Sequence, residues 1–279
     1  MSRIHSTAIV EEGAVIGENV TIEPYAVVKK NVTLGAHVVV KSHAYIDGHT
    51  TIGERTVIWP GASIGTKTQD LKFQGEKTFV TIGQACEIRE FVTINASCGE
   101  GSTVSIGDHC LVMAYCHVAH NCSIGHHVIM ANGAMLAGHV TLEDFVVIGG
   151  MTPIHQRSRI GRYAMVGGLS RVTSDVPPYT LGAGVPYRVG GLNLVGLKRH
   201  RFHYELRRDL TKVFKLTYRS KFGLEEALAK IEQEVELSPE VKHWVSFCRS
   251  SKRGLIGLHK NQGVFGEDID DAKDLLEEG

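Results

Sequence analysis

Aliphatic residues recur at every sixth position through more than half of this chain. From Ile4 to Val172, 26 of the 29 positions in this register hold an aliphatic residue or methionine. A period of six matches neither the 3.6-residue turn of an α-helix nor the alternation of an ordinary strand. It is typical of a parallel β-helix, in which each flat face of a coil takes about six residues. High glycine and aliphatic content with only 7% aromatic residues agrees with such stacked coils.

Three positions of the register are acidic, yet its phase is kept on both sides of them. Asp70 and Glu76 interrupt it first, and Glu100 interrupts it again. Because the phase survives, we expect residues 66–79 and 95–105 to be loops extruded from a continuous coil. Ordered loops on a rigid scaffold often carry function, so these two are the first candidates for a site.

Small residues occupy two further slots of the repeat. The residue after the aliphatic is often glycine, which we expect where the backbone turns a corner and needs permissive dihedral angles. The slot four residues after the aliphatic holds four of the six cysteines: Cys86, Cys110, Cys116 and Cys122. Zinc binding needs cysteines that converge on one point, whereas these are distributed over successive faces. We therefore interpret them as free, small packing residues.

The pattern changes after Val172. The string DVPPY ends the repeat, a glycine-rich connector follows at 182–191, and the remaining chain has helical periodicity. The sequence predicts a mainly β protein with a parallel β-helix at 1–190, an α-helical domain at 191–257 and an acidic tail at 258–279. Within the second domain we expect helices at 203–219, 223–236 and 239–250.

Charge and hydropathy narrow the classes of function. Thirty Lys and Arg balance thirty Asp and Glu, which argues against a dedicated nucleic-acid binder. No apolar run is long enough to span a membrane and the start lacks a secretory signal, so we expect a cytoplasmic protein with reduced thiols. The neutral total hides an asymmetry: residues 267–279 have a net charge of −6 and residues 1–266 have +6. Nine Lys and Arg within 198–221 suit docking of an acidic protein.

Four histidines are expected to gather at one corner of the coil. If three faces make a coil of eighteen residues, His139 and His155 fall near the coil positions directly above His120. We expect neighbouring rings roughly 5 Å apart and the outer pair about 10 Å apart, with His117 near the same corner. Two chemistries remain open: a histidine that acts as general base on a substrate hydroxyl, or three histidines that bind zinc.

Several strings are together specific for one family. TQDLKF, HVAHNCSIG, LAGHV, IGGMTPIHQ, MVGG, DVPPY, NLVGLKR and RGLIG, spread between Ile4 and Gly257, resemble UDP-N-acetylglucosamine 3-O-acyltransferase, the first enzyme of lipid A synthesis. The resemblance implies a homotrimer of left-handed β-helices with active sites between neighbouring subunits. It implies transfer of a fatty acyl group, usually 3-hydroxyacyl, from acyl carrier protein to the glucosamine 3-hydroxyl, without a cofactor or metal.

The resemblance also assigns roles to residues of this sequence. His120 matches the general base, the N–H of Gly138 matches the donor to the oxyanion, and Asn121 follows the base. Gly168 matches the floor of the acyl groove, where a glycine leaves room for a long chain, on the order of C14. Contacts to sugar, nucleotide or pantetheine are matched by Gln69, Asp70, Lys72, His117, His139, His155, Gln156, Asn193 and Arg199.

Three features depart from the family pattern. Asn121 stands where many members have Asp, and an amide can orient His120 but cannot stabilise its imidazolium as a carboxylate would. Val195 stands where a nucleotide-contacting Glu is common, and the acidic tail extends past the usual end.

Three alternatives remain at this stage. One is a zinc-dependent hydratase of the same superfamily, and another is a non-catalytic β-helix scaffold. The third is a related N-acyltransferase, which should carry an N-terminal uridine-binding domain, whereas here the repeat begins at Ile4.

Overall fold

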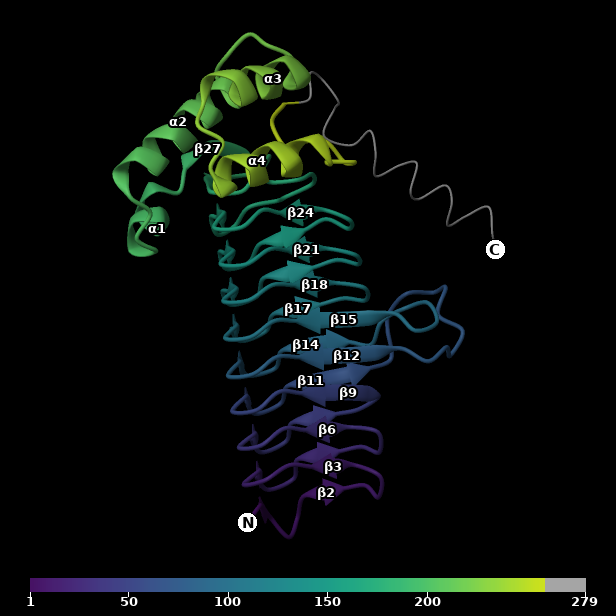
Figure 1. Cartoon of the computed structure of the whole chain (residues 1–279). Helices are drawn as coiled ribbons and strands as arrows, with labels where there is room; N and C mark the ends of the chain where they lie inside the picture. The colour runs from purple at the N-terminus through teal and green to yellow at the C-terminus, as the bar shows by residue number, and fades with distance from the viewer. Residues whose placement is uncertain (259–279) are drawn as a thin grey trace.

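The chain folds into a tall three-sided column of short strands with a group of helices at its far end (Figure 1). The computed structural model describes residues 1–258. Each coil of the column contributes one strand to each of three sheets. The first sheet has eleven strands, in the spatial order β1 (Arg3–Ile4), β4 (Thr21–Ile22), β7 (Val39–Val40), β10 (Val57–Ile58), β13 (Glu87–Ile88), β16 (Leu111–Val112), β19 (Ile129–Met130), β22 (Val147–Ile148), β25 (Met165–Val166), β26 (Thr180–Ala183) and β27 (Arg188–Leu192).

The other two sheets have eight strands each. The second sheet contains β2 (Ile9–Val10), β5 (Val27–Val28), β8 (Tyr45–Ile46), β11 (Ser63–Thr66), β14 (Thr93–Asn95), β17 (His117–Val118), β20 (Met135–Leu136) and β23 (Pro153–Ile154). The third contains β3 (Val15–Ile16), β6 (Thr33–Leu34), β9 (His49–Ile52), β12 (Phe79–Ile82), β15 (Thr103–Ile106), β18 (Ser123–Ile124), β21 (Thr141–Leu142) and β24 (Arg159–Ile160). All pairings are parallel except that of β26 with β27, so the predicted parallel β-helix is confirmed.

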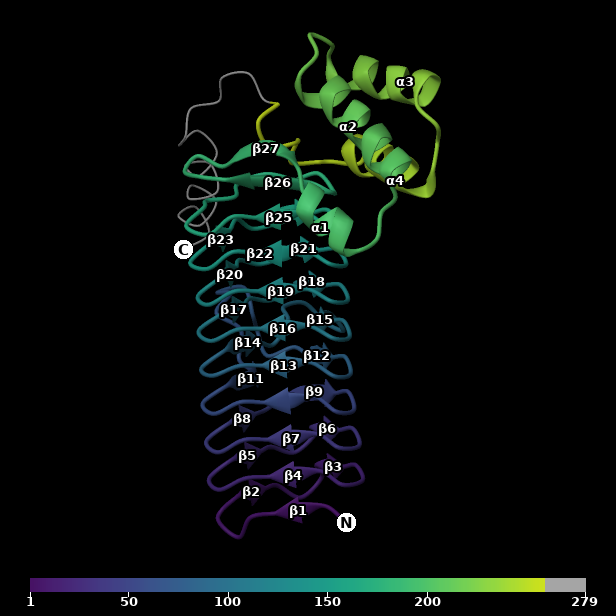
Figure 2. The ribbon, with the colours of Figure 1, turned by 90° about the vertical axis from the view of Figure 1, so that its left-hand side faces the viewer.

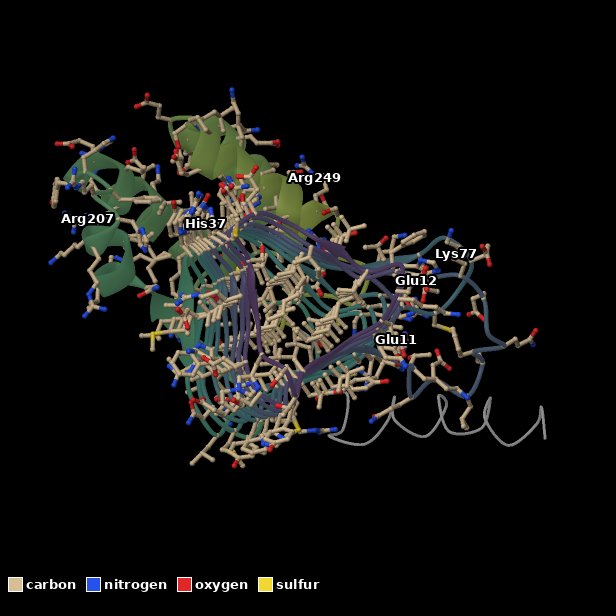
Figure 3. The ribbon with its side chains drawn as sticks, turned by 90° about the horizontal axis from the view of Figure 1, so that it is seen from below. Glu11, Glu12, His37, Lys77, Arg207 and Arg249 are labelled. Carbon is tan, nitrogen blue, oxygen red and sulfur yellow. The ribbon has the colours of Figure 1, made fainter. Side chains whose placement is uncertain are left out.

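The three edges of the column are named here by the sheets that they join. The chain passes from the first to the second sheet at edge 1–2, then turns at edge 2–3 and edge 3–1. Figure 3 looks along the column. Two loops leave it at edge 2–3, on the side of Glu11, Glu12 and Lys77, and the helices lie beside His37 at edge 3–1. The expected extrusions are therefore real, and both leave the same edge.

The aliphatic register forms the core of the column. Residues eighteen apart pair in register, as Ile4 does with Ile22, and the second residue of each short strand points inward. Ile22, Val40 and Ile58 are fully buried. Because each coil buries three such residues and hydrogen-bonds to the next, repetition of one local pattern builds a continuous core.

The corner geometry corrects our explanation of the glycines. Left-handed backbone occurs three residues after the aliphatic, at residues such as Asn31 (φ +69°) and His37 (φ +60°), types that tolerate it. Of the glycines directly after the aliphatic, Gly65 has left-handed backbone (φ +75°), but most of the others do not, and these are needed for close approach between coils instead. A Cβ on Gly35 would lie 2.7 Å from the Glu54 nitrogen, and one on Gly53 would lie 2.5 Å from the Gly83 carbonyl carbon.

The cysteines pack as expected. All six are free, and the four in the repeat slot are buried. The Cys116 thiol donates to the Ala131 carbonyl at 3.1 Å and the Cys122 thiol to the Ala137 carbonyl at 3.2 Å, one coil away. They fill the corner and satisfy backbone acceptors there.

Four helices follow the column: α1 (Leu194–Arg199), α2 (Tyr204–Tyr218), α3 (Leu224–Glu234) and α4 (Pro239–Arg249). The last three agree with the expected helices to within a few residues, and Ser238 with Pro239 starts α4 as a cap and first-turn pair. Figure 2 shows α2, α3 and α4 packed together at the far end, with α1 lying against the side of the column. None of the helices in residues 1–258 is long and apolar enough to cross a membrane.

Aromatic stacking and one ion pair fasten the helices to edge 3–1. Phe145 and Tyr163 stack on successive coils with ring centroids 4.6 Å apart, and His200 after α1 meets both rings edge-on. Nearby, Nε2 of His243 in α4 lies 3.0 Å from a carboxylate oxygen of Glu143. Burial raises the pKa of Glu143, but His243 and the Arg162 N–H outweigh it, and the net pKa is below its usual value.

Replacing Glu143 with glutamine should destabilise the protein in a pH-dependent way. A carboxyl whose pKa is lowered on folding contributes stability above its unfolded value of about 4.3, and the contribution is lost as pH falls through the folded pKa. At pH 7 we expect a loss of about 1–2 kcal/mol, between the values for exposed and buried pairs. Urea unfolding should show the difference from wild type shrinking below about pH 4. The exposed Glu12→Gln change is the control, and an equal effect there would contradict the assignment.

Candidate active site

Two loops project from edge 2–3 and support each other. Residues 67–78 connect β11 to β12, and residues 96–102 connect β14 to β15. The Gly101 N–H donates to the Lys77 carbonyl at 2.8 Å, and the Gly99 N–H donates to the Glu76 carboxylate at 2.7 Å. Backbone N–H groups, that of Gly99 foremost, lower the pKa of Glu76 to about 2. The second loop is thus a brace for the first.

The first loop brings a carboxylate to His120. Oδ2 of Asp70 lies 3.6 Å from Nε2 of His120, and both side chains are only about one-fifth exposed. The other oxygen of Asp70 accepts a hydrogen bond from the Lys72 N–H at 2.9 Å. That N–H and the charge of His120 hold the pKa of Asp70 below its usual value. A charged carboxylate therefore lies close to Nε2 of the imidazole.

Asn121 holds the other nitrogen of the ring. Its Nδ2 donates to the Cys98 carbonyl at 3.0 Å, so its Oδ1 is the atom 2.8 Å from Nδ1 of His120. An amide oxygen only accepts, which places the proton on Nδ1 and leaves the lone pair on Nε2. The Asn121 N–H also donates to Oγ of Ser97 at 3.2 Å. One residue thereby sets the tautomer of His120 and ties the second loop to the coil.

Gly138 lies directly against the face of the same ring. A Cβ at this position would lie 2.4 Å from both Cε1 and Nε2 of His120. The backbone here needs no left-handed angle, so the glycine is required by contact with the ring. Among the hydrogen bonds of residues 1–258, none uses the Gly138 N–H as donor. A free backbone donor therefore lies beside Nε2.

His139 and His117 surround His120 as expected. The rings of His120 and His139 are perpendicular with centroids 5.2 Å apart, which confirms the predicted neighbour spacing. Nδ1 of His117 lies 2.8 Å from the Thr93 hydroxyl. Burial lowers the pKa of His117 and of His139, and the charges of His120 and, at His139, of Arg157 lower them further. Both rings are therefore suited to be neutral hydrogen-bonding groups.

His155 and Gln156 lie on the same edge one coil higher. The β20–β23 register aligns His155 with Ala137 and Gln156 with Gly138, so the residue directly above His139 is Arg157. Nδ1 of His155 lies 3.2 Å from the Gln156 carbonyl oxygen. The predicted 10 Å spacing of the outer pair stays a prediction.

Gln69 lies in the first loop on edge 2–3, whereas three further predicted residues lie on other edges. Gly168 follows β25 at edge 1–2, where its nearest neighbour is the backbone of Gly150. Asn193 caps α1 beside edge 3–1, where its Nδ2 donates to the Tyr163 carbonyl at 3.0 Å, and Arg199 ends that helix. Within one chain these three residues do not converge on His120.

Sequence reasoning missed the contribution of the second loop, residues 96–102, to the site. Ser97 and Cys98 position Asn121, and burial with the charge of Asp70 raises the pKa of the Cys98 thiol to about 11, so it stays protonated. The extrusion of residues 95–105 was the available signal, because a loop that interrupts the repeat beside the first loop is placed to support it.

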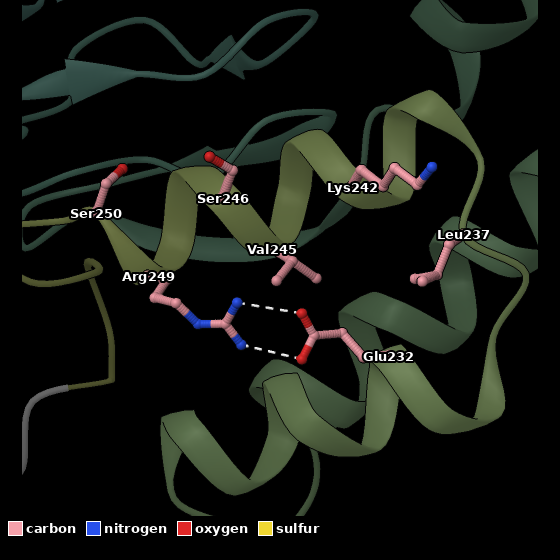
Figure 4. A pocket seen from close by; sticks show the side chains of 7 residues that line it. All are labelled: Glu232, Leu237, Lys242, Val245, Ser246, Arg249 and Ser250. Atoms are coloured by element: carbon pink, nitrogen blue, oxygen red, sulfur yellow. Dashed lines mark hydrogen bonds and ion pairs between the residues drawn. The ribbon is translucent and has the colours of Figure 1, made fainter.

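A hollow of about 440 Å³ lies between α3 and α4, apart from this cluster (Figure 4). Arg249 and Glu232 close one side of it through two hydrogen bonds of 3.1 Å each. It contains none of the predicted site residues. In residues 1–258 no group of three or more His, Cys, Asp or Glu is arranged to hold a metal ion, so the zinc interpretation has no ligand set there.

The repeat and the site agree with known proteins. The family model for bacterial transferase hexapeptide repeats matches residues 13–48 and 103–138, and that for domain 2 of UDP-N-acetylglucosamine O-acyltransferase matches 175–256. The acyl-[acyl-carrier-protein]–UDP-N-acetylglucosamine O-acyltransferase of Chlamydia abortus is 56% identical over 278 residues, covering 99% of this chain and all of that protein. Its counterpart in Chlamydia pneumoniae is 53% identical with the same coverage.

Solved structures give the same result. The UDP-N-acetylglucosamine acyltransferase from Campylobacter jejuni is 41% identical with a TM-score of 0.85, covering 91% of this chain and 98% of that one. The Bacteroides fragilis enzyme is 36% identical with a TM-score of 0.88, covering 91% and 99%.

The fold and the repeat define a hexapeptide-repeat transferase. With such identity over its full length, the chain belongs to the UDP-N-acetylglucosamine O-acyltransferase family. This confirms the family predicted from the sequence strings, and it favours O-acyl transfer over the hydratase, N-acyltransferase and scaffold alternatives.

Proposed function

We propose that this chain transfers a fatty acyl group, usually 3-hydroxyacyl, from acyl carrier protein to the 3-hydroxyl of UDP-N-acetylglucosamine, with His120 as general base. One observation carries the assignment of the base. Asn121 fixes the proton of His120 on Nδ1, while Nε2 lies 3.6 Å from Asp70 and next to Gly138, whose N–H donates to no other group in residues 1–258. Nucleophile activation and oxyanion stabilisation are thus available at one point.

The chemistry follows from these positions. Nε2 of His120 takes the proton of the sugar hydroxyl as its oxygen attacks the thioester carbonyl. The carbonyl oxygen becomes an oxyanion, which accepts a hydrogen bond from the Gly138 N–H. When the C–S bond breaks, the imidazolium returns its proton to the departing pantetheine thiolate, which leaves an ester on the sugar and a thiol on the carrier protein.

Asp70 offers the negative charge that Asn121 lacks. A carboxylate 3.6 Å from Nε2 favours the imidazolium formed during the reaction, whereas the amide of Asn121 is neutral. Aspartate at position 121 would turn a second acceptor toward the Cys98 carbonyl oxygen, where the amide now donates. We infer a division of roles in which Asn121 orients the ring and Asp70, beside Lys72, supplies charge and contacts the sugar.

The scatter of the predicted site residues over three edges, that of His120 included, supports a site shared between subunits. We propose a homotrimer in which edge 2–3 of one subunit meets Gly168, Asn193 and Arg199 of its neighbours. Edge 1–2 has the surface for such contact, because it exposes a row of large apolar side chains. Their exposed fractions are 52% at Phe91, 65% at Tyr115, 59% at Met151 and 74% at Leu169.

The defining experiment uses the full chain with UDP-N-acetylglucosamine and a panel of acyl carrier protein thioesters. We expect one product, with an ester at the sugar 3-hydroxyl by NMR, and free carrier protein thiol in equal amount. Absence of product with every thioester, or acylation at nitrogen, would reject the function.

Replacing Gly168 with methionine should shorten the preferred acyl chain. A Cβ at Gly168 would already lie 3.2 Å from the Gly150 carbonyl oxygen, so a longer side chain must extend into the space outside the coil. If that space is the acyl groove, chains on the order of C14 should lose at least about tenfold in kcat/KM relative to C10, since each excluded methylene costs about 0.8 kcal/mol. The measurement is a competition between thioesters of different length. An unchanged preference for acyl chain length would contradict the assignment of Gly168 to the acyl groove.

A further inference from the structure

Four basic residues form one exposed stripe along α2 and its C-cap. Arg208, Lys212, Lys215 and Arg219 are spaced i, i+4, i+7 and i+11, and all are exposed. The opposite side of α2 is buried against the other helices through Leu206, Leu210, Val213, Phe214 and Thr217. The four cations therefore line a single face, called the basic stripe below.

The basic stripe has more positive charge than its surroundings neutralise. Arg208 pairs with Asp209 at 3.2 Å, and Lys212 lies 3.3 Å from a carboxylate oxygen of Glu234. Within residues 1–258, no carboxylate pairs with Lys215 or Arg219, and the guanidinium of Arg219 donates to the Gly190 carbonyl and lies over the Phe214 ring. An acidic ligand would thus find two cations without a carboxylate partner, Lys215 and Arg219, at the C-terminal end of α2, and two exposed, paired cations toward its N-terminal end.

The C-terminal residues of the chain have the matching pattern of charge. Residues 267–279 carry seven Asp and Glu and one Lys. Four of the acidic residues repeat the spacing of the basic stripe: Glu267, Asp271, Asp274 and Glu278. This segment lies outside the described residues.

The chain leaves the described structure close to the basic stripe. The Tyr218 hydroxyl donates to the Ile256 carbonyl at 3.0 Å, so Leu258 lies near the C-terminal end of α2. Eight residues, 259–266, separate Leu258 from the acidic segment and can span up to about 26 Å. The fifteen residues of α2 are about 22 Å long. The acidic segment can therefore reach the whole stripe of its own chain.

We propose that residues 267–279 bind the basic stripe of their own chain and compete there with the acidic carrier protein. Competition, though not the binding itself, rests on the proposed function. A segment tethered to its own site raises the KM for carrier protein by the factor 1 + K, where K is its binding equilibrium constant, and leaves kcat unchanged. Occupancy of 70–90% would raise KM by about 3–10-fold, and salt should weaken the effect.

Binding is tested first, without any acyl transfer. A carbodiimide joins carboxylates to lysines in contact, and the monomer band of a denaturing gel contains the links within one chain. In the full-length protein we expect a peptide joining Lys215 to residues 267–279, lost in about 0.5 M salt. The Lys212–Glu234 pair serves as internal control for the reagent. If that link forms and none reaches 267–279, the proposal is overturned, whether or not the protein is an acyltransferase.

Competition is tested with two full-length variants of equal charge. The stripe-matched variant is Asp271→Asn, Asp274→Asn, Glu278→Gln. The control variant is Asp268→Asn, Asp270→Asn, Glu277→Gln. At low salt the first should lower the KM for acyl carrier protein by about 3–10-fold with kcat unchanged, and the second by less than about twofold. An equal decrease of KM in both variants would show that net charge alone, and not the matched positions, causes the effect. An unchanged KM in both variants would overturn competition.

Discussion

Replacing His120 with alanine should lower kcat by about 10³–10⁴-fold, with little change in thermal stability. The substitution removes the imidazole whose Nε2 lies 3.6 Å from Asp70 and next to Gly138. Without it the sugar hydroxyl must attack while still protonated, and the departing thiolate has no proton donor. Single-turnover transfer from acyl carrier protein measures the loss directly.

The control for this prediction is another histidine of the coil. His37 lies on edge 3–1 in left-handed backbone, and asparagine tolerates that conformation. His37→Asn should therefore keep wild-type kcat. Survival of more than about one-hundredth of the activity in His120→Ala would reject the base assignment, because general-base removal is worth at least about a hundredfold.

Replacing Gly138 with alanine should lower kcat by about 10²–10³-fold. The loss is large because the change disturbs both the base, His120, and the N–H that would stabilise the oxyanion. The added Cβ would fall 2.4 Å from Nε2 of His120, so the ring must turn away from Asn121 and Asp70. The backbone itself accepts alanine, and the loss should appear without unfolding. Kinetics and a thermal melt of the same preparation separate the two effects.

Gly190→Ala is the matched control for Gly138. A Cβ at Gly190 would meet only the Leu181 carbonyl oxygen, at an ordinary 3.5 Å. This variant should keep both kcat and melting temperature. If Gly138→Ala also keeps its kcat, the contact between the glycine and the His120 ring has no catalytic role.

The repeat made the column predictable, because six-residue periodicity is local information that recurs in every coil. The positions of Ile22, Val40 and Ile58 in the core follow from that period alone. The phase on either side of Asp70 and Glu100 likewise predicted two extruded loops. Our explanation of the corner glycines holds for Gly65 but was wrong for most of the others, because close approach between coils is a property of two neighbouring coils, which a single hexad does not contain.

The candidate site was only partly predictable. Stacking at eighteen residues placed His139 beside His120, and the family strings named Asp70 and Gly138. The contacts of Asn121 with Ser97 and Cys98 were not foreseen, since they join a coil corner to a loop more than twenty residues earlier. Such contacts depend on the path of the loop, and its amino-acid pattern carries no period that fixes that path.

The sequence by itself determined the β-helix, the helices after it and the family. Periodic patterns of residues indicate the β-helix and the helices, and contiguous sequence motifs indicate the family. Tertiary structure alone decided that the carboxylate facing His120 comes from the loop residue Asp70, and that Asn121 turns its amide oxygen to the ring. It also decided that the predicted residues lie on three edges of the column. The physical reason is that orientation and convergence depend on distances between segments remote in the chain, whereas periodicity records only which residues face inward.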